Sequence, residues 1–142
     1  MEVAMNWLLI VGIGVVAAGS LCSREGRAQD AAFSGYKCNI KHSQQLEKDG
    51  SLQPSSFAST YKEFVVDRAS GRMLGGTASG VWKYAVWDRG SDQQSFKAVY
   101  TSQGPYLHVQ FLEIREFVEG AAKPFVLTDG MYVHTGLCAH LN

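Results

Sequence analysis

The chain has 142 residues, of which 46% are hydrophobic and 18% charged, which fits one compact domain and excludes two of ordinary size. Thirteen basic residues balance 13 acidic ones, and the two signs are interspersed. Because a nucleic-acid-binding protein would be expected to carry a basic stripe, we expect no nucleic-acid partner.

The first thirty residues look like an export leader. Residues 7–18, WLLIVGIGVVAA, are an unbroken apolar run that is short for a membrane span but suits the core of a signal peptide. Ala28, with the small Gly26 two positions before it, is a plausible cleavage site. The sequence therefore predicts a signal peptide over 1–28 and a single mature domain over 29–142, located in the periplasm or outside the cell.

The start of this leader leaves alternatives open. MEVAMN has no Lys or Arg and carries Glu2, whereas a signal peptide normally begins with positive charge, so Met5 is an alternative initiator. An uncleaved leader would act as an anchor, and would be the only link to a membrane. Lipidation at Cys22 is disfavoured, because Leu21 stands where that signal requires a small residue.

Cleavage after Ala28 would remove Cys22 and leave Cys38 and Cys138. An even pair of cysteines in an exported chain predicts a disulfide. The bridge would close a loop of about one hundred residues, which the chain-entropy model values at about 4 kcal/mol. Two free buried thiols are the alternative.

Short apolar runs separated by turn residues predict an all-β domain, a small antiparallel meander of about seven to eight strands. Tyr36, Cys38 and Ile40 alternate along the first strand, and Asp49-Gly50 indicates a two-residue type I′ hairpin after it. The later strand-like runs are KEFVV (62–66), RML (72–74), VWKYAVW (81–87), SFKAVY (95–100), PYLHVQFLEIREFV (105–118), KPFVL (123–127) and MYVHTGLC (131–138).

The turn between FVV and RML has the residues of a hairpin loop. Asp67 can accept hydrogen bonds from loop amides, and Gly71 can occupy the left-handed conformation. A phosphate-binding loop is the alternative, but such a loop directs amides from the start of a helix, and no helical pattern follows.

The long run 105–118 changes its apolar parity. Leu107, Val109 and Phe111 share one face, whereas Leu112 and Ile114 fall on the other. We expect a β-bulge near residues 111–113 to bring them together. Long bent strands of this kind are typical of small barrels and strongly twisted sandwiches, and we favour a barrel.

The run VWKYAVW is apolar on both faces. Trp82, Tyr84 and Val86 alternate with Val81, Ala85 and Trp87, so either both faces are covered or one presents aromatic side chains to a partner. A tryptophan that caps a barrel end is the alternative. The candidate residues for binding a ligand or partner are Trp82, Tyr84, Trp87, Tyr100 and Phe111.

Enzymatic chemistry has little support in the sequence. The four histidines, at positions 42, 108, 134 and 140, show no metal-ligand spacing, so we expect no metal and no cofactor. There is no G-x-S-x-G nucleophile motif, and Glu113, Glu116 and Glu119 look like the solvated edge of a strand. We assign no catalytic residue; an enzyme would need His108, His134 and Glu113 to converge in a cavity.

Several ordered motifs nevertheless carry a resemblance. They are Y-K-C, L-x-x-D-G-x-L, F-V-V-D-R-x-S-G-R-M, D-R-G-S-x-x-x-S-F-K, F-V-E-G-x-x-K-P-F and T-G-x-C, and they span residues 36 to 138. The set resembles a family of small exported bacterial proteins without an assigned activity, and it includes both cysteines of the predicted bridge. The architecture is also similar to periplasmic lysozyme inhibitors of the membrane-bound type, but their recognition loop is absent from this sequence.

Two functions therefore remain as hypotheses. In the first, the domain is a non-enzymatic scaffold that binds another envelope component through exposed aromatic side chains. In the second, a barrel carries a small apolar ligand in an interior lined by Phe96, Tyr100, Phe111 and Phe125. A periplasmic enzyme inhibitor and an enzyme come after these two.

Overall fold

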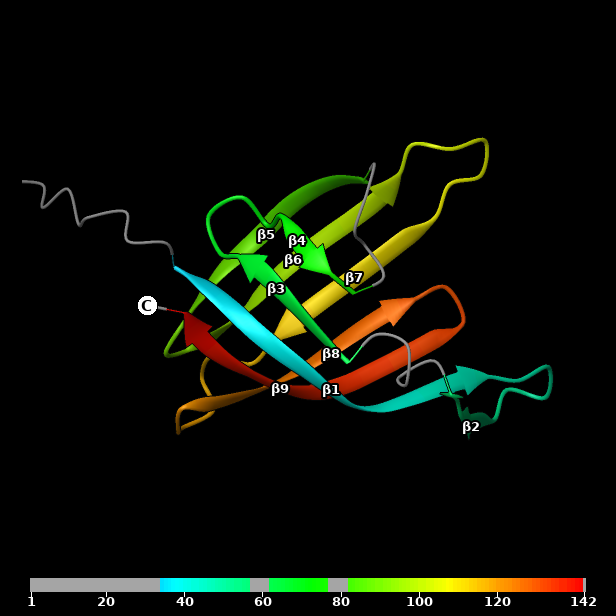
Figure 1. Ribbon diagram of the computed structural model, residues 1–142, viewed down its shortest axis with the longest axis horizontal. Helices are drawn as coiled ribbons and strands as arrows, with labels where there is room; N and C mark the ends of the chain where they lie inside the picture. Colours follow the sequence, from blue (N-terminus) through cyan, green and yellow to red (C-terminus); the bar gives the residue numbers. More distant parts are fainter. Residues whose placement is uncertain (1–33, 57–61, 77–81, 142) are drawn as a thin grey trace, which may run out of the picture.

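The computed structural model describes residues 34–56, 62–76 and 82–141, and it shows one sheet of nine antiparallel strands curled into a half-barrel (Figure 1). The all-β prediction is therefore confirmed. The strands are β1 (Gly35–Leu46), β2 (Leu52–Pro54), β3 (Glu63–Asp67), β4 (Met73–Gly75), β5 (Trp82–Ser91), β6 (Gln94–Ser102), β7 (Val109–Ile114), β8 (Ala122–Asp129) and β9 (Tyr132–Leu141).

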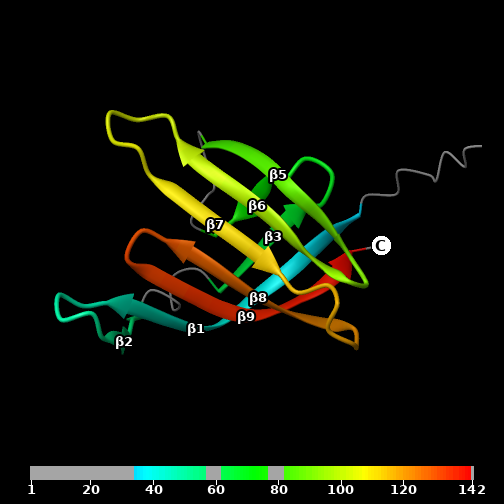
Figure 2. The same cartoon turned by 180° about the vertical axis from the view of Figure 1, so that it is seen from behind.

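The strand order is β4-β3-β1-β9-β8-β7-β6-β5, and the short β2 pairs with the far end of β1. Strands β5 to β9 form the predicted meander, and they lie side by side in chain order in Figure 2. The first long strand, β1, does not lie next to β5, the first strand of the meander. It pairs instead with β9, the last strand of the meander. The sequence thus predicted the hairpins but not this long-range pairing.

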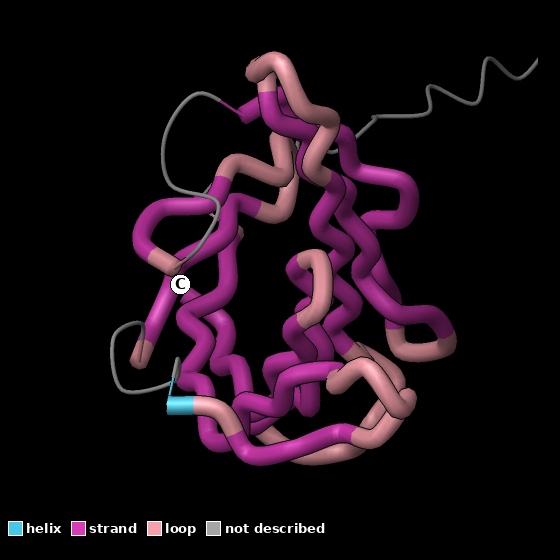
Figure 3. Tube along the Cα trace, turned by 90° about the vertical axis from the view of Figure 1, so that its right-hand side faces the viewer, coloured by secondary structure: helices cyan, strands magenta, loops and turns pink. Residues whose placement is uncertain are grey.

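The strands curl around the interior of the domain (Figure 3). The buried hydrophobic side chains pack together there as the core. Every second residue of a strand points inward. Tyr36, Cys38 and Ile40 do so along β1, as the alternation predicted, and all three are buried. The other large core side chains are Phe64, Phe96, Tyr100, Leu112, Ile114, Phe125 and Leu127.

Cys38 and Cys138 form the predicted disulfide, which joins β1 to β9 across a sequence separation of 100 residues. The two residues are directly opposite each other in the strand register, and both are buried. The bridge therefore ties the beginning of the described domain to its end.

Both predicted segments form turns, but only the turn between β3 and β4 has the predicted geometry. Asp67 accepts hydrogen bonds from the Ser70 amide and hydroxyl, both at 2.6 Å, and Gly71 has a φ of 79°, as its turn chemistry predicted. Gly50 also has positive φ, at 83°, but Asp49 does not, so the first hairpin is not of type I′. Its loop instead places one glycine in the left-handed region after a turn closed from the Gly50 amide to the Glu47 carbonyl.

The bulge expected near residues 111–113 is absent. Strand β7 pairs without a register shift on both sides, so Leu112 and Ile114 point into the core. Val109 and Phe111 point to the other face, and Val109 is exposed. The bulges of the described sheet lie elsewhere, between Ile40 and His42 in β1 and between Val86 and Asp88 in β5.

The turn between β3 and β4 closes the open side of the half-barrel. Arg68 in this turn donates from Nε to the Arg89 carbonyl and from Nη2 to the Gly90 carbonyl, both at 2.6 Å. A Cβ on Gly71 would lie 2.9 Å from the Val86 side chain, so the glycine lets the turn approach β5. Side-chain bonds, rather than a strand ladder, connect the turn to β5 here.

The predicted signal peptide, its cleavage site and Cys22 lie outside the described residues. Over the part of the chain that is described, no helix has the length and apolarity to cross a membrane.

Candidate functional site

Two of the five candidate binding residues meet on the outer face of the sheet. The β5 pairing steps from Val86–Ala98 to Asp88–Lys97, which leaves Trp87 as the extra residue of the bulge. Trp87 is 69% exposed, and its ring centroid lies 6.2 Å from that of the half-buried Phe111 on β7. The bulge therefore presents a large aromatic side chain to solvent.

The other three candidates lie toward the inner side of the curl. Tyr100 is fully buried, and burial raises the pKa of its phenol, so it belongs to the core rather than to a docking surface. Tyr84 is its partner across the β5–β6 pair, but at the edge of the sheet it stays 44% exposed. Trp82 is half-buried and packs edge-on against His108, with the two ring centroids 5.4 Å apart.

A surface groove of about 370 Å³ runs along β5 beside these aromatic residues. It is lined by six consecutive residues from Tyr84 to Arg89 and, on the opposite side, by Ala69 and Ser70 of the β3–β4 turn. We call Tyr84, Trp87 and Phe111 the aromatic edge. It combines an exposed indole, a half-exposed phenol and a groove along an edge strand.

A polar cluster occupies the interior near the β8–β9 turn. The Ser43 hydroxyl is hydrogen-bonded to Nδ1 of His134, and both side chains are buried. Burial lowers the pKa of His134, with the Asp129 charge acting in the opposite direction, so the imidazole is neutral near pH 7. Asp129 also pairs with His108, whose Nε2 lies 2.5 Å from its Oδ1.

This cluster brings together two of the three residues that an enzyme would need. His108 and His134 both lie beside Asp129, but Glu113 points to the outer face, where it accepts a hydrogen bond from the Ser95 hydroxyl at 2.8 Å. Because Ser43 is only 7% exposed and His134 is 0% exposed, a substrate does not reach their bond. The Ser43–His134 hydrogen bond links β1 to β9, and the Asp129–His108 pair links β8 to the segment before β7, so the arrangement stabilises the fold.

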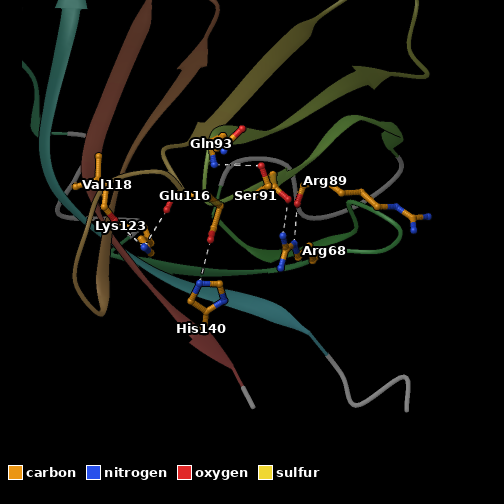
Figure 4. Close-up of polar contacts among 9 residues, drawn as sticks. Arg68, Arg89, Ser91, Gln93, Glu116, Val118, Lys123 and His140 are labelled. Atoms are coloured by element: carbon orange, nitrogen blue, oxygen red, sulfur yellow. Dashed lines mark hydrogen bonds and ion pairs between the residues drawn. The ribbon is translucent and has the colours of Figure 1, made fainter. Parts of the chain in front are cut away.

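Glu116 corrects the sequence-based expectation of a solvated edge, since it is 7% exposed. Its Oε2 lies 3.1 Å from Nε2 of His140 on β9 (Figure 4). Lys123 holds the same turn by donating to the carbonyls of Glu116 and Val118, at 2.9 and 2.6 Å. Burial, together with the Glu116 charge, raises the pKa of Tyr36.

The sequence could not reveal this role of Glu116, because the residue follows the end of β7 in a turn where polar residues are usually solvated. The turn instead folds back against β5, so a Cβ on Gly90 would lie 2.8 Å from the Glu116 side chain. Glu116, His140 and Lys123 together anchor the β7–β8 turn to β5 and β9. These contacts stabilise the fold.

Within the described ranges, no three Asp, Glu, His or Cys side chains gather as a metal site would require. Comparisons with models of protein families, with curated proteins and with solved structures found no match.

Proposed function

We propose that the mature domain is a non-enzymatic binding protein of the cell envelope, exported to an oxidising compartment, and that a partner protein covers its aromatic edge. The observation that carries this proposal is the 69% exposure of Trp87, held against Phe111 on the outer face. Exposed aromatic residues clustered on a surface mark interaction sites, and tryptophan and tyrosine are enriched among the residues that dominate interface energies.

The way in which Trp87 is held also supports binding. The β5 bulge fixes its backbone, and Arg68 bonds to the next part of the same strand at Arg89 and Gly90. A side chain held on a braced strand loses less conformational freedom on binding than one on a loop. This preorganisation suits a docking residue.

The disulfide supports the proposed location, since such bridges persist in exported proteins and are rare in the cytosol. Cys38 and Cys138 are both buried, so the bridge belongs to the folded core. An oxidising, extracytoplasmic compartment is compatible with this pairing.

The carrier hypothesis has less support. Phe96, Tyr100 and Phe125, which would line its cavity, are packed in the core and at most 4% exposed. Phe111, the fourth expected lining residue, contacts Trp87 on the outer face instead. The side chains that would surround an apolar ligand therefore fill the interior themselves.

Co-purification from the native organism tests the proposal. Tagged wild-type protein should recover a defined envelope protein, and Trp87→Ser should reduce that recovery at least tenfold. Truncating an aromatic residue at the centre of an interface costs about 2 kcal/mol or more of binding free energy, and about 1.4 kcal/mol corresponds to a tenfold change in affinity. Leu74→Ser, at an exposed apolar residue of β4 outside the aromatic edge, is the matched control and should recover the partner normally.

Two results would contradict the proposal. One is equal recovery of the same protein by the wild type and by Trp87→Ser when both are folded. The other is a lipid or another small apolar molecule bound stoichiometrically to the purified protein in native mass spectrometry, which would favour the carrier.

A further inference from the structure

A second surface, on the outer face of β1, β8 and β9, is built by the bulge in β1. The register shifts between Ile40 and His42, while Ile40 and Ser43 on either side both point inward. Two successive residues, Lys41 and His42, therefore lie exposed on the outer face. A regular strand would have sent one of the two inward.

A groove of about 460 Å³ opens beside this bulge. Its apolar floor comes from Pro124 and Val126 of β8 and Leu137 of β9, and Leu137 is 42% exposed. Arg115, at the end of β7, stands on the side opposite Lys41 and His42. We call these six residues the cationic groove.

The groove continues past the bulge. A neighbouring hollow shares Lys41, His42 and Thr135 with it and extends to Gln44, Pro54 and Ser55. Both hollows together run across three strands, from the end of β7 to β2. That shape suits an extended segment better than a compact small molecule.

The charged side chains that line the two hollows, Lys41 and Arg115, are both basic. Neither hollow is lined by an Asp or Glu. Within residues 34–56, 62–76 and 82–141, the side chains of Lys41, His42 and Arg115 form no ion pair and no hydrogen bond. Two acidic residues on the strands beside this surface already have partners: Glu113, opposite Val126, accepts a bond from the Ser95 hydroxyl, and Glu63 pairs with Lys37 at 3.1 Å.

We propose that the cationic groove binds an extended acidic segment of a partner polypeptide, whose carboxylates pair with Lys41 and Arg115 while an apolar side chain covers Val126 and Leu137. Cations that have no partner of their own favour a negative ligand, and the apolar floor between them favours alternating acidic and apolar residues over a bare anion. This site is separate from the aromatic edge, and it does not depend on that proposal.

Fluorescence anisotropy with a labelled hexapeptide of alternating Glu and Leu tests the proposal on the mature protein. The peptide should bind, and a peptide with Lys in place of Glu should not. The double variant Lys41→Glu with Arg115→Glu should weaken binding at least tenfold. Lys48→Glu with Lys83→Glu makes the same change in net charge at exposed residues outside the groove, and should change binding less than twofold.

The floor is tested separately. Leu137→Ser should weaken binding several-fold, and a peptide with Ser in place of Leu should bind the wild type correspondingly less. Circular dichroism of each variant shows whether it remains folded, and Lys41→Gln with Arg115→Gln serves as a milder pair if the charge reversal disturbs folding.

Three outcomes would overturn the proposal. They are equal binding by both charge-reversal pairs, equal binding of the Glu and Lys peptides, and a wild-type dimer in sedimentation that is lost in the Lys41 and Arg115 variant without any peptide binding. The last result would assign the groove to a second copy of the chain. None of these outcomes bears on Trp87, so the two proposals can fail independently.

Discussion

At the scale of single residues, the buried His134 should make the stability of the fold depend on pH. His134 is fully buried and bonded to Ser43, and burial lowers the pKa of its imidazole. The unfolded chain returns this histidine to water, where its pKa is about 6.5. Below that pH the unfolded chain therefore binds a proton that the folded chain resists.

The free energy of unfolding should consequently fall as the pH is lowered from 7 to 5. One such group contributes a slope of up to about 1.4 kcal/mol per pH unit. Urea unfolding at several pH values measures this slope, and His134→Gln should flatten it. Gln44→Asn, at an exposed residue of β1 that does not titrate, is the control and should leave the slope unchanged. A His134→Gln curve parallel to the wild type would show that another group carries the pH dependence.

At the scale of the strands, β1 and β9 approach each other closely at Gly136. A Cβ on Gly136 would lie 2.0 Å from the Asn39 carbonyl oxygen and 2.9 Å from the Phe125 ring. This approach occurs next to the β1 bulge, where Ile40 pairs with Gly136 and His42 with Thr135. Glycine at 136 thus permits the bend that also exposes Lys41.

Gly136→Ala should therefore lower the free energy of unfolding by about 3 kcal/mol, because backbone must move to make room for the methyl group. Urea unfolding compares it with Gly104→Ala, where the nearest atom to a new Cβ is 4.0 Å away and a change within about 0.5 kcal/mol is expected. Equal stabilities for the two variants would mean that β1 and β9 can separate at this point without cost.

The sequence predicted those strand features that follow from local rules. Alternation identified the inward face of β1, and the Asp67 to Gly71 turn had the residues that its geometry requires. The bulge in β5 was hidden, because a run that is apolar on both faces gives no parity change where the extra residue enters. The change of parity in residues 105–118 had another cause, since Val109 lies exposed on the outer face while Leu112 lies in the core.

The candidate site was predictable only in part, because burial at several of its positions depends on contacts between strands that are far apart in the sequence. The sequence selected Trp87 and Phe111, but it could not separate them from Tyr100, which the register places in the core. Lys41 and His42 gave no signal, because their shared exposure depends on the long-range pairing of β1 with β9. Glu116 is buried only because its turn folds back on β5.

At the scale of the whole molecule, the fold is a curled sheet held shut by a few long-range contacts. The Cys38–Cys138 bridge ties β1 to β9, and Arg68 ties the β3–β4 turn to β5. The interior is filled by its own aromatic side chains, so the two proposed binding surfaces are built from solvent-exposed residues. They are the aromatic edge on β5 to β7 and the cationic groove on β1, β8 and β9.

Site-specific photo-crosslinking of the full chain in its native organism tests directly whether a partner protein contacts Trp87. A benzophenone amino acid at position 87 should crosslink to one defined envelope protein, whereas the same group at position 74, where Leu74 is also apolar and exposed, should not. Identical crosslinking patterns from positions 87 and 74, or no protein adduct from either, would contradict the account of this domain as a binding protein that acts through Trp87.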